Sequence, residues 1–157
     1  MNKIRILFLC HGNICRSVMA EYMMKDMARG LGREEEFEID SAALTTEEIG
    51  NPIYPPARRK LEEKGIPIGN HRARLVTTAD AQHFEYLIGM DTENMWMLRR
   101  LMDRAGESYE DKCFRLPEFA GKSGSISDPW YTRDFETCYH DINEGLEGLL
   151  AYLDERD

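Results

Sequence analysis

The chain has 157 residues, of which 42% are hydrophobic and 31% charged, and its 29 acidic and 20 basic side chains give a formal net charge of −9. This length and composition are typical of one folded domain, so we expect residues 1–157 to form a single domain that needs no disulfide or metal to stabilise it. The acidic balance argues against a nucleic-acid-binding protein, because no surplus of basic side chains is present to displace counterions from phosphates.

Strand and helix patterns alternate from the N-terminus onward. Residues 4–9 form a short apolar run that is typical of a buried strand. Residues 17–29 follow with helical spacing, and Gly30 and Gly32 end the pattern. We expect the buried face of this helix to carry Ala20, Met23, Met24, Met27 and Leu31.

The alternation continues to the C-terminus. Thr77 and Thr78 are predicted to cap a short helical turn, and residues 122–129 to form a loop rich in glycine and serine. The last helix has an apolar stripe that consists of Phe135, Tyr139, Ile142, Leu146, Leu149, Leu150 and Leu153. The other predicted elements are helices at 56–64 and 92–104 and strands at 37–42, 86–90 and 113–116.

This alternation implies an α/β fold, a three-layer sandwich in which helices cover both faces of a four-stranded parallel sheet. In such sheets, ligands bind at the carboxyl ends of the strands. Functional residues are therefore expected at the strand ends, which are Cys10, Ala42, Met90 and the loop beyond Leu116.

The four cysteines, at positions 10, 15, 113 and 138, are too few and too scattered for a disulfide framework and lack zinc-ligand spacing. The apolar stretch at residues 6–10 is too short for a secretory signal, and no run approaches the length of a membrane span. We expect a cytoplasmic protein that does not bind membranes.

The loop after the first strand carries the clearest chemical signal, Cys10-His11-Gly12-Asn13-Ile14-Cys15-Arg16-Ser17. A cysteine followed six residues later by an arginine is weak by itself, because this composition can produce one by chance. The setting adds weight, since the loop joins a strand to a helix and contains Gly12 and Asn13, which tolerate left-handed dihedral angles. Such a loop can turn successive N–H groups inward as a phosphate-binding nest.

The residue types in this loop suit nucleophilic attack on phosphorus. We expect Cys10 to be a thiolate at neutral pH, because N–H groups, a helix N-terminus and an arginine all stabilise its charge. The planar fork of Arg16 can hold two phosphoryl oxygens, and Ser17 can donate to the departing thiolate. The alternative is a buried cysteine that closes a strand and an exposed arginine that opens a helix.

Asp128 is the candidate proton donor for the leaving oxygen. Pro129 favours an extended conformation at Asp128 and keeps it off a helix, while Trp130 and Tyr131 can flank a flat leaving group. The alternative is that the Asp-Pro pair only starts a turn.

These residues resemble the low-molecular-weight protein tyrosine phosphatase family. The family loop Cys-x-Gly-Asn-Ile-Cys-Arg-Ser is matched at residues 10–17 and is followed by Ala20-Glu21. Further matches in the family's order extend from residue 4 to about residue 153. They are Ser41-Ala42-Ala43, Glu48-Ile49-Gly50-Asn51-Pro52, Gly65-Ile66-Pro67, His71-x-Ala73-Arg74, Met90-Asp91-x-x-Asn94 and Asp128-Pro129-Trp130-Tyr131.

The resemblance implies hydrolysis of phosphotyrosine proteins or small aryl phosphates through a phosphocysteine on Cys10, with Asp128 first as acid and then as base. It implies no metal or other cofactor, a monomer or weak dimer, and phosphate, sulfate or vanadate as active-site anions. It places substrate contacts at His11, Gly12, Asn13, Ile14, Cys15, Arg16, Ser17, Glu47, Trp130 and Tyr131. Asn13, Ser17, Ser41 and His71 would hold the loop by hydrogen bonds, with Asp91 beside His71.

Four positions depart from the family pattern. Val18 stands where the family usually has proline, and His11 stands where the residue is often apolar. Glu47 stands at a position of the pocket wall that is commonly aromatic, and Trp130 stands where tyrosine is usual. No departure removes a catalytic group. Val18 is expected to loosen the loop slightly, because proline at the first helical turn pre-sets the helix. The other three lie at the rim and affect substrate preference, and Glu47 would disfavour an acidic residue beside the phosphotyrosine. Family members also form a disulfide between the positions of Cys10 and Cys15 under oxidant, which protects the nucleophile.

Three other activities compete with this interpretation. An arsenate reductase on the same fold needs two further redox cysteines near the third strand, and residues 73–104 contain none. Phosphoarginine phosphatases tend to have threonine where Ile14 stands. A phosphocarrier or noncatalytic phosphate-binding module has no need of both Arg16 and an acid at position 128.

Overall fold

A four-stranded parallel sheet with strand order β2-β1-β3-β4 forms the centre of the structure, a computed structural model that describes residues 2–156. The strands are β1 (Ile4–Cys10), β2 (Phe37–Ala43), β3 (Tyr86–Gly89) and β4 (Cys113–Arg115). All three pairings are parallel, and Cys10 at the end of β1 lies beside Ala43 at the end of β2. The carboxyl ends of the strands therefore meet at one edge, as expected.

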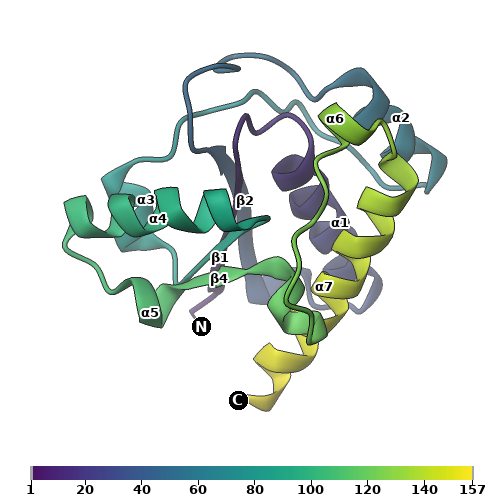
Figure 1. The fold of residues 1–157 in the computed structure, drawn as a ribbon. Helices are drawn as coiled ribbons and strands as arrows, with labels where there is room; N and C mark the ends of the chain where they lie inside the picture. The colour runs from purple at the N-terminus through teal and green to yellow at the C-terminus, as the bar shows by residue number, and fades with distance from the viewer. Residues whose placement is uncertain (1, 157) are drawn as a thin grey trace.

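Helices cover both faces of this sheet (Figure 1). On one side lie α1 (Arg16–Gly30), α2 (Pro55–Glu63), α6 (Pro129–Thr132) and α7 (Phe135–Glu155). On the other lie α3 (Thr78–His83), α4 (Thr92–Ala105) and α5 (Tyr109–Lys112). Two short 3-10 helices, η1 (Glu34–Glu36) and η2 (Leu116–Ala120), precede β2 and follow β4. The predicted three-layer α/β sandwich is confirmed.

The central strand β1 divides its side chains between two cores. Ile6 and Phe8 belong to the cluster packed with α1 and α7, whereas Leu7 and Leu9 belong to the cluster packed with α3 and α4. All four are fully buried, because successive side chains of a strand point to opposite faces and helices cover both. The continuous apolar run in β1 is the sequence signature of this double burial.

The predicted elements differ from the structure mainly at their ends. The buried face predicted for residues 17–29 was wrong at its C-terminal end, since Leu31 is 59% exposed and Met27 only partly buried. The reason is that Leu31 is already the C-cap of α1, where the chain turns at Gly32 with a φ of 69°. The apolar stripe of α7 is confirmed, with Tyr139 partly buried and the other six residues buried.

Other boundaries moved for local reasons. The strand predicted at 113–116 ends at Arg115, because Leu116 and Pro117 begin η2. The strand predicted at 86–90 likewise ends one residue earlier, at Gly89. Pro129, at the end of the predicted loop, starts the four-residue helix α6.

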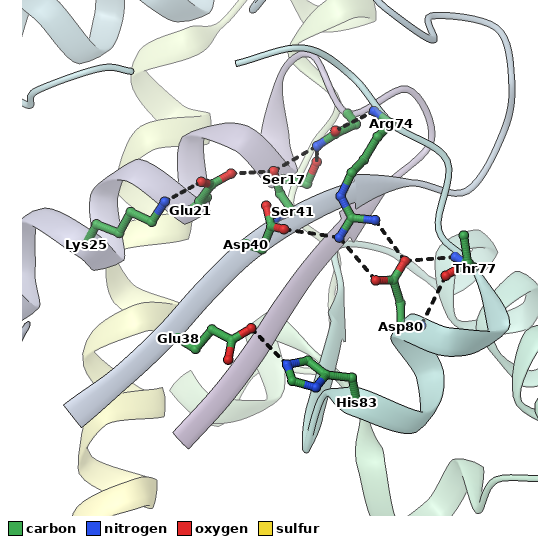
Figure 2. Close-up of polar contacts among 11 residues, drawn as sticks. Ser17, Glu21, Lys25, Glu38, Asp40, Ser41, Arg74, Thr77, Asp80 and His83 are labelled. Carbon is green, nitrogen blue, oxygen red and sulfur yellow. Dashed lines mark hydrogen bonds and ion pairs between the residues drawn. The ribbon is translucent and has the colours of Figure 1, made fainter. Parts of the chain in front are cut away.

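A charged cluster holds the segment before α3 against the sheet (Figure 2). The Arg74 guanidinium donates to both carboxylate oxygens of Asp80 and to Asp40 on β2. Asp80 and Thr77 form a capping box at the start of α3, which confirms the predicted cap. Burial alone would raise the pKa of Asp80, but the hydrogen bonds from Arg74 and Thr77 outweigh it and lower that pKa.

Asp80→Asn should lower the free energy of unfolding by about 1–2 kcal/mol at neutral pH, because it removes the charge that pairs with Arg74 and weakens the hydrogen bond that the side chain accepts from Thr77 N. The folded-state pKa of Asp80 lies below the unfolded value of about 3.9. Its contribution is therefore present above that pH and is lost as the pH falls through the folded value. Urea unfolding from pH 7 to pH 3 should show the gap between wild type and variant closing.

Glu110→Gln is the control, because it removes a carboxylate from an exposed ion pair with Arg99 and should cost less than about 1 kcal/mol. A gap between wild type and Asp80→Asn that stays constant down to pH 3 would contradict the assignment.

Candidate active site

The loop between β1 and α1 holds its carbonyl oxygens outward. Each of five loop carbonyls accepts a hydrogen bond from a group beyond the loop. The pairs are Cys10 with Leu44 N, His11 with Thr45 N, Asn13 with His71 Nε2, Ile14 with Tyr54 N and Cys15 with Met19 N. In a trans peptide the C=O and the following N–H point in opposite directions, so these contacts turn the loop N–H groups inward.

The inward N–H groups are available to a ligand. Within residues 2–156, the backbone N–H groups of His11, Gly12, Ile14 and Cys15 have no hydrogen-bond acceptor. Asn13 lies between Gly12 and Ile14, and its N–H donates to Cys10 Sγ at 3.4 Å. Helix α1 begins at Arg16, so its N-terminus lies directly behind the loop. Unpaired N–H groups at a helix N-terminus form the anion-binding nest that the loop sequence predicts.

Asn13 supports this loop from within. It is fully buried and has a left-handed φ of 61°, as expected for an asparagine in a tight loop. Its Nδ2 donates to Ser17 Oγ at 2.8 Å and to Ser41 Oγ at 3.0 Å, while its Oδ1 accepts from Arg74 N. The structure thus joins Asn13 to Ser17, Ser41 and His71, the residues that the family resemblance places behind the loop.

The Cys10 sulfur lies at the base of the loop. The residue is only 4% exposed, and Ser17 Oγ is 3.1 Å from Sγ. Together with the N–H of Asn13, this hydroxyl gives the sulfur two polar neighbours suited to a negative charge.

Arg16 is held in place beside the sulfur. Its Nη1 donates to Asp91 at 2.8 Å and to the Ile126 carbonyl at 2.9 Å, and its Nη2 lies 3.5 Å from Asp128. Burial disfavours the charged guanidinium, but Cys10, Asp128 and Asp91 together hold the pKa of Arg16 above its usual value. The arginine is therefore a permanent buried cation, and the alternative of an exposed helix-opening residue is wrong, since Arg16 is 3% exposed.

Asp91 differs from its expected arrangement. We expected it beside His71, but it binds Arg16 and caps α4 by accepting from Asn94 N. His71 instead donates to the carbonyl of Asn13 at 2.6 Å. In the part of the chain that the structure describes, no hydrogen bond or ion pair joins Asp91 to His71. Asp91 lies two residues beyond the end of β3, so its place in the site follows from the meeting of strand ends at one edge of the sheet.

Asp128 reaches the same site from the opposite end of the sequence. It is extended, with φ −86° and ψ 109°, as the following Pro129 predicts, and its Oδ1 caps α6 by accepting from Trp130 N. Its Oδ2 faces Arg16, and the side chain is 28% exposed. The carboxyl group thus has a partner in the site and access to solvent.

A pocket of about 380 Å³ opens above the Cys10 sulfur. At its rim the His11 ring contacts the Glu47 carboxylate, and Trp130 packs on Tyr54 with ring centroids 4.7 Å apart. Tyr131 is 81% exposed. The lining consists of Cys10, His11, Gly12, Ile14, Cys15, Arg16, Glu47, Glu48, Asp91, Glu93, Asn94, Asp128, Trp130 and Tyr131.

Sequence reasoning missed several residues of this site. Glu48, Glu93 and Asn94 line the pocket, and Tyr54 supports Trp130. Asn94 and Glu48 belong to sequence blocks that match the family, so the blocks themselves were the available signal. The match indicated that these segments matter, but it did not indicate that these two side chains line the pocket. Tyr54 carries no signal of its own, because its role depends on a contact with a residue far along the chain.

The other three cysteines are buried thiols. Burial raises the pKa of Cys15 above its usual range, and the neighbouring Cys10 and Asp128 raise it further. Burial also raises the pKa of both Cys113 and Cys138 to about 12. All four cysteines are free, so the structure has the reduced form of the Cys10 and Cys15 pair.

Two features are absent from residues 2–156. Nowhere in that range do three or more histidine, cysteine, aspartate or glutamate side chains gather so that they could hold a metal ion. None of the helices in that range is both long and apolar enough to cross a bilayer.

Comparison with known proteins places this geometry in a family. Residues 5–157 match the family profile described as low molecular weight phosphotyrosine protein phosphatase. The chain is 38% identical over 152 residues to the Bacillus subtilis low molecular weight protein-tyrosine-phosphatase YfkJ, an alignment that covers 96% of each protein. The crystal structure of YfkJ has a TM-score of 0.92 at 35% identity, covering 100% of this chain and 98% of that one.

Two other similar crystal structures bear on the pocket. One is a protein tyrosine phosphatase from Entamoeba histolytica with Hepes in the active site, at 29% identity and a TM-score of 0.88, covering 98% of each chain. The other is a drosophila arginine phosphatase, at 27% identity and a TM-score of 0.89, covering 97% of this chain and 99% of that one.

Proposed function

This chain belongs to the low molecular weight phosphotyrosine protein phosphatase family, and we propose that it hydrolyses phosphotyrosine and small aryl phosphates in the pocket above Cys10, through a phosphocysteine on that residue. The chief support for this mechanism is the set of unpaired loop N–H groups that surround the Cys10 sulfur beside the buried cation of Arg16. A phosphoryl group carries negative oxygens that match both features.

The first step transfers the phosphoryl group to sulfur. The Cys10 thiolate attacks phosphorus and forms an S–P bond while the P–O bond to the phenol breaks. Asp128, protonated at this point, gives its proton to the leaving oxygen. The loop N–H groups and Arg16 stabilise the charge on the phosphoryl oxygens as the bond breaks.

The second step releases phosphate. Asp128, now a carboxylate, removes a proton from a water molecule that attacks phosphorus, and the S–P bond breaks. The sulfur leaves as a thiolate, which the hydroxyl of Ser17 stabilises by donating to it. The position of Asp128 near Arg16 and in the pocket lining supports both of its roles.

Two observations favour aryl ester hydrolysis over the competing activities. The apolar Ile14 lines the pocket where phosphoarginine phosphatases tend to have threonine. Cys113 and Cys138 are buried and absent from the lining, which argues against a cysteine relay for arsenate reduction. We propose phosphate, sulfate and vanadate as anions that occupy the same nest, in line with Hepes, a sulfonate, in the active site of the Entamoeba histolytica relative.

Cys10→Ser should abolish hydrolysis of p-nitrophenyl phosphate and of a phosphotyrosine peptide, because serine lacks an ionised nucleophile at neutral pH. Release of inorganic phosphate measures this, with phosphoserine and phosphoarginine peptides and arsenate reduction assayed beside it. Cys113→Ser is the matched control and should retain activity, since that thiol lies outside the pocket lining. Turnover by Cys10→Ser equal to wild type, or a preference for phosphoarginine, would overturn the proposal.

Asp128→Asn should slow hydrolysis by about 10²–10⁴-fold for an ester with a poorly acidic leaving phenol, because the amide cannot supply a proton. The loss should shrink with p-nitrophenol and shrink further with more acidic phenols, which leave without protonation. A series of aryl phosphates gives the dependence of kcat/KM on leaving-group acidity. An equal loss across the series would remove Asp128 from the acid role.

Glu47 should disfavour substrates with acidic residues beside the phosphotyrosine, because its exposed carboxylate stands at the pocket rim next to His11. Glu47→Gln should raise kcat/KM about two- to fivefold for an acidic phosphopeptide and leave p-nitrophenyl phosphate nearly unchanged. The difference should diminish at 0.5 M salt. Glu35→Gln, an exposed position on η1 outside the pocket lining, is the control, and equal effects of both variants would contradict the assignment.

A further inference from the structure

A buried carboxylate, Glu21, lies behind the loop and outside the pocket lining. It stands on α1, is 6% exposed, and its Oε1 accepts from Ser41 Oγ at 2.6 Å. Its Oε2 accepts from Lys25 Nζ, also at 2.6 Å. Figure 2 shows this chain of contacts from Lys25 through Glu21 to Ser41. A buried charge is costly unless it is paired, so an ionised Glu21 depends on Lys25 and constrains its other neighbour.

That constraint concerns the direction of hydrogen bonds. An ionised carboxylate only accepts, so the single hydroxyl hydrogen of Ser41 is committed to Glu21. Ser41 Oγ can then only accept from Asn13 Nδ2, which lies 3.0 Å away. The N–H of Arg74 donates to Asn13 Oδ1 and fixes the same orientation of the amide from its other end.

The same donor-to-acceptor order extends from Asn13 through Ser17 to the Cys10 sulfur. The Asn13 amide has two hydrogens, and its second donates to Ser17 Oγ at 2.8 Å. Ser17 therefore accepts from Asn13 and keeps its own hydrogen. The remaining partner for that hydrogen among the described residues is Cys10 Sγ at 3.1 Å. The hydroxyl thus donates to the sulfur, which is the arrangement that stabilises a thiolate.

We propose that Glu21 is a positioning residue that sets the direction of the chain Ser41–Asn13–Ser17 and so keeps the Ser17 hydroxyl donating to the Cys10 thiolate. This inference rests on the proposed function, because it takes the thiolate to be the nucleophile. Without an acceptor at position 21, the Ser41 hydroxyl is free to donate to the Asn13 side chain, which favours the flipped amide with its oxygen toward Ser41 and Ser17. Arg74 N alone then opposes that flip, and a flipped amide would accept the Ser17 hydrogen that otherwise goes to Cys10.

The proposal and a direct electrostatic effect of Glu21 predict opposite changes in the ionisation of Cys10 when the charge at position 21 is removed. A negative charge at Glu21 repels a thiolate, so Coulomb forces alone predict that removing the charge favours ionisation of Cys10. Loss of the directed hydrogen bond predicts the reverse. Lys25 compensates the charge of Glu21 and weakens the direct effect.

The test is the pH dependence of Cys10 alkylation by iodoacetamide, followed by mass spectrometry of the Cys10 peptide. Glu21→Met removes the acceptor and keeps the side-chain volume, and it should raise the pH of half-maximal alkylation rate by about one unit. Ser41→Ala breaks the chain at its next member and should raise it similarly. The double variant should show no shift beyond that of Ser41→Ala, since both act through one path.

Asp26→Met is the matched control, because it removes a partly exposed carboxylate from the same helix and should leave the midpoint unchanged. Circular dichroism verifies folding, and Ser41→Ala provides an independent test if Glu21→Met does not fold. An unchanged or lower midpoint in either folded variant, or shifts that add in the double variant, would overturn the role of Glu21. A wild-type Cys10 that reacts only at alkaline pH would instead overturn the proposed function.

Discussion

The geometry of the peptide plane is the constraint on which the site depends. Five carbonyl groups of the loop after β1 are bound from outside, by residues 44–45 at the end of β2, by Tyr54 at the start of α2, by His71 in the segment before α3 and by the first turn of α1. Because C=O and N–H point oppositely across each peptide bond, fastening the carbonyls turns the N–H groups toward the pocket. The anion nest is therefore a product of the whole sheet edge, and the eight-residue loop could not hold it alone.

The remaining groups of the site come from the other strand ends. Ser41 lies on β2, Asp91 follows β3, and Asp128 follows the long connection beyond β4. A parallel sheet brings these ends together regardless of their distance in sequence. Each group then serves the buried loop in a different way, as Ser41 orients Asn13, Asp91 holds Arg16, and Asp128 brings a solvent-accessible carboxyl group to the pocket.

Much of this could be predicted from the sequence, because the relevant signals are local. The apolar run of β1, the stripe of α7 and the strand–loop–helix setting of Cys10 depend on neighbours within a few residues. The long-range partners were less accessible, since the contact of Asp91 with Arg16 and that of Tyr54 with Trp130 depend on how distant segments pack. Short helices such as α5 and η2 also escaped, because a single turn has no periodicity to detect.

The way Arg16 is held has a consequence for turnover. Asp91 and the Ile126 carbonyl both accept hydrogen bonds from its guanidinium, and these bonds favour a preorganised cradle for an anion. A rigid cradle of this kind recognises the phosphoryl oxygens, which the ester and free phosphate share. Under the proposed function, inorganic phosphate would compete with the substrate, and slow release of the product would then limit the rate of each catalytic cycle.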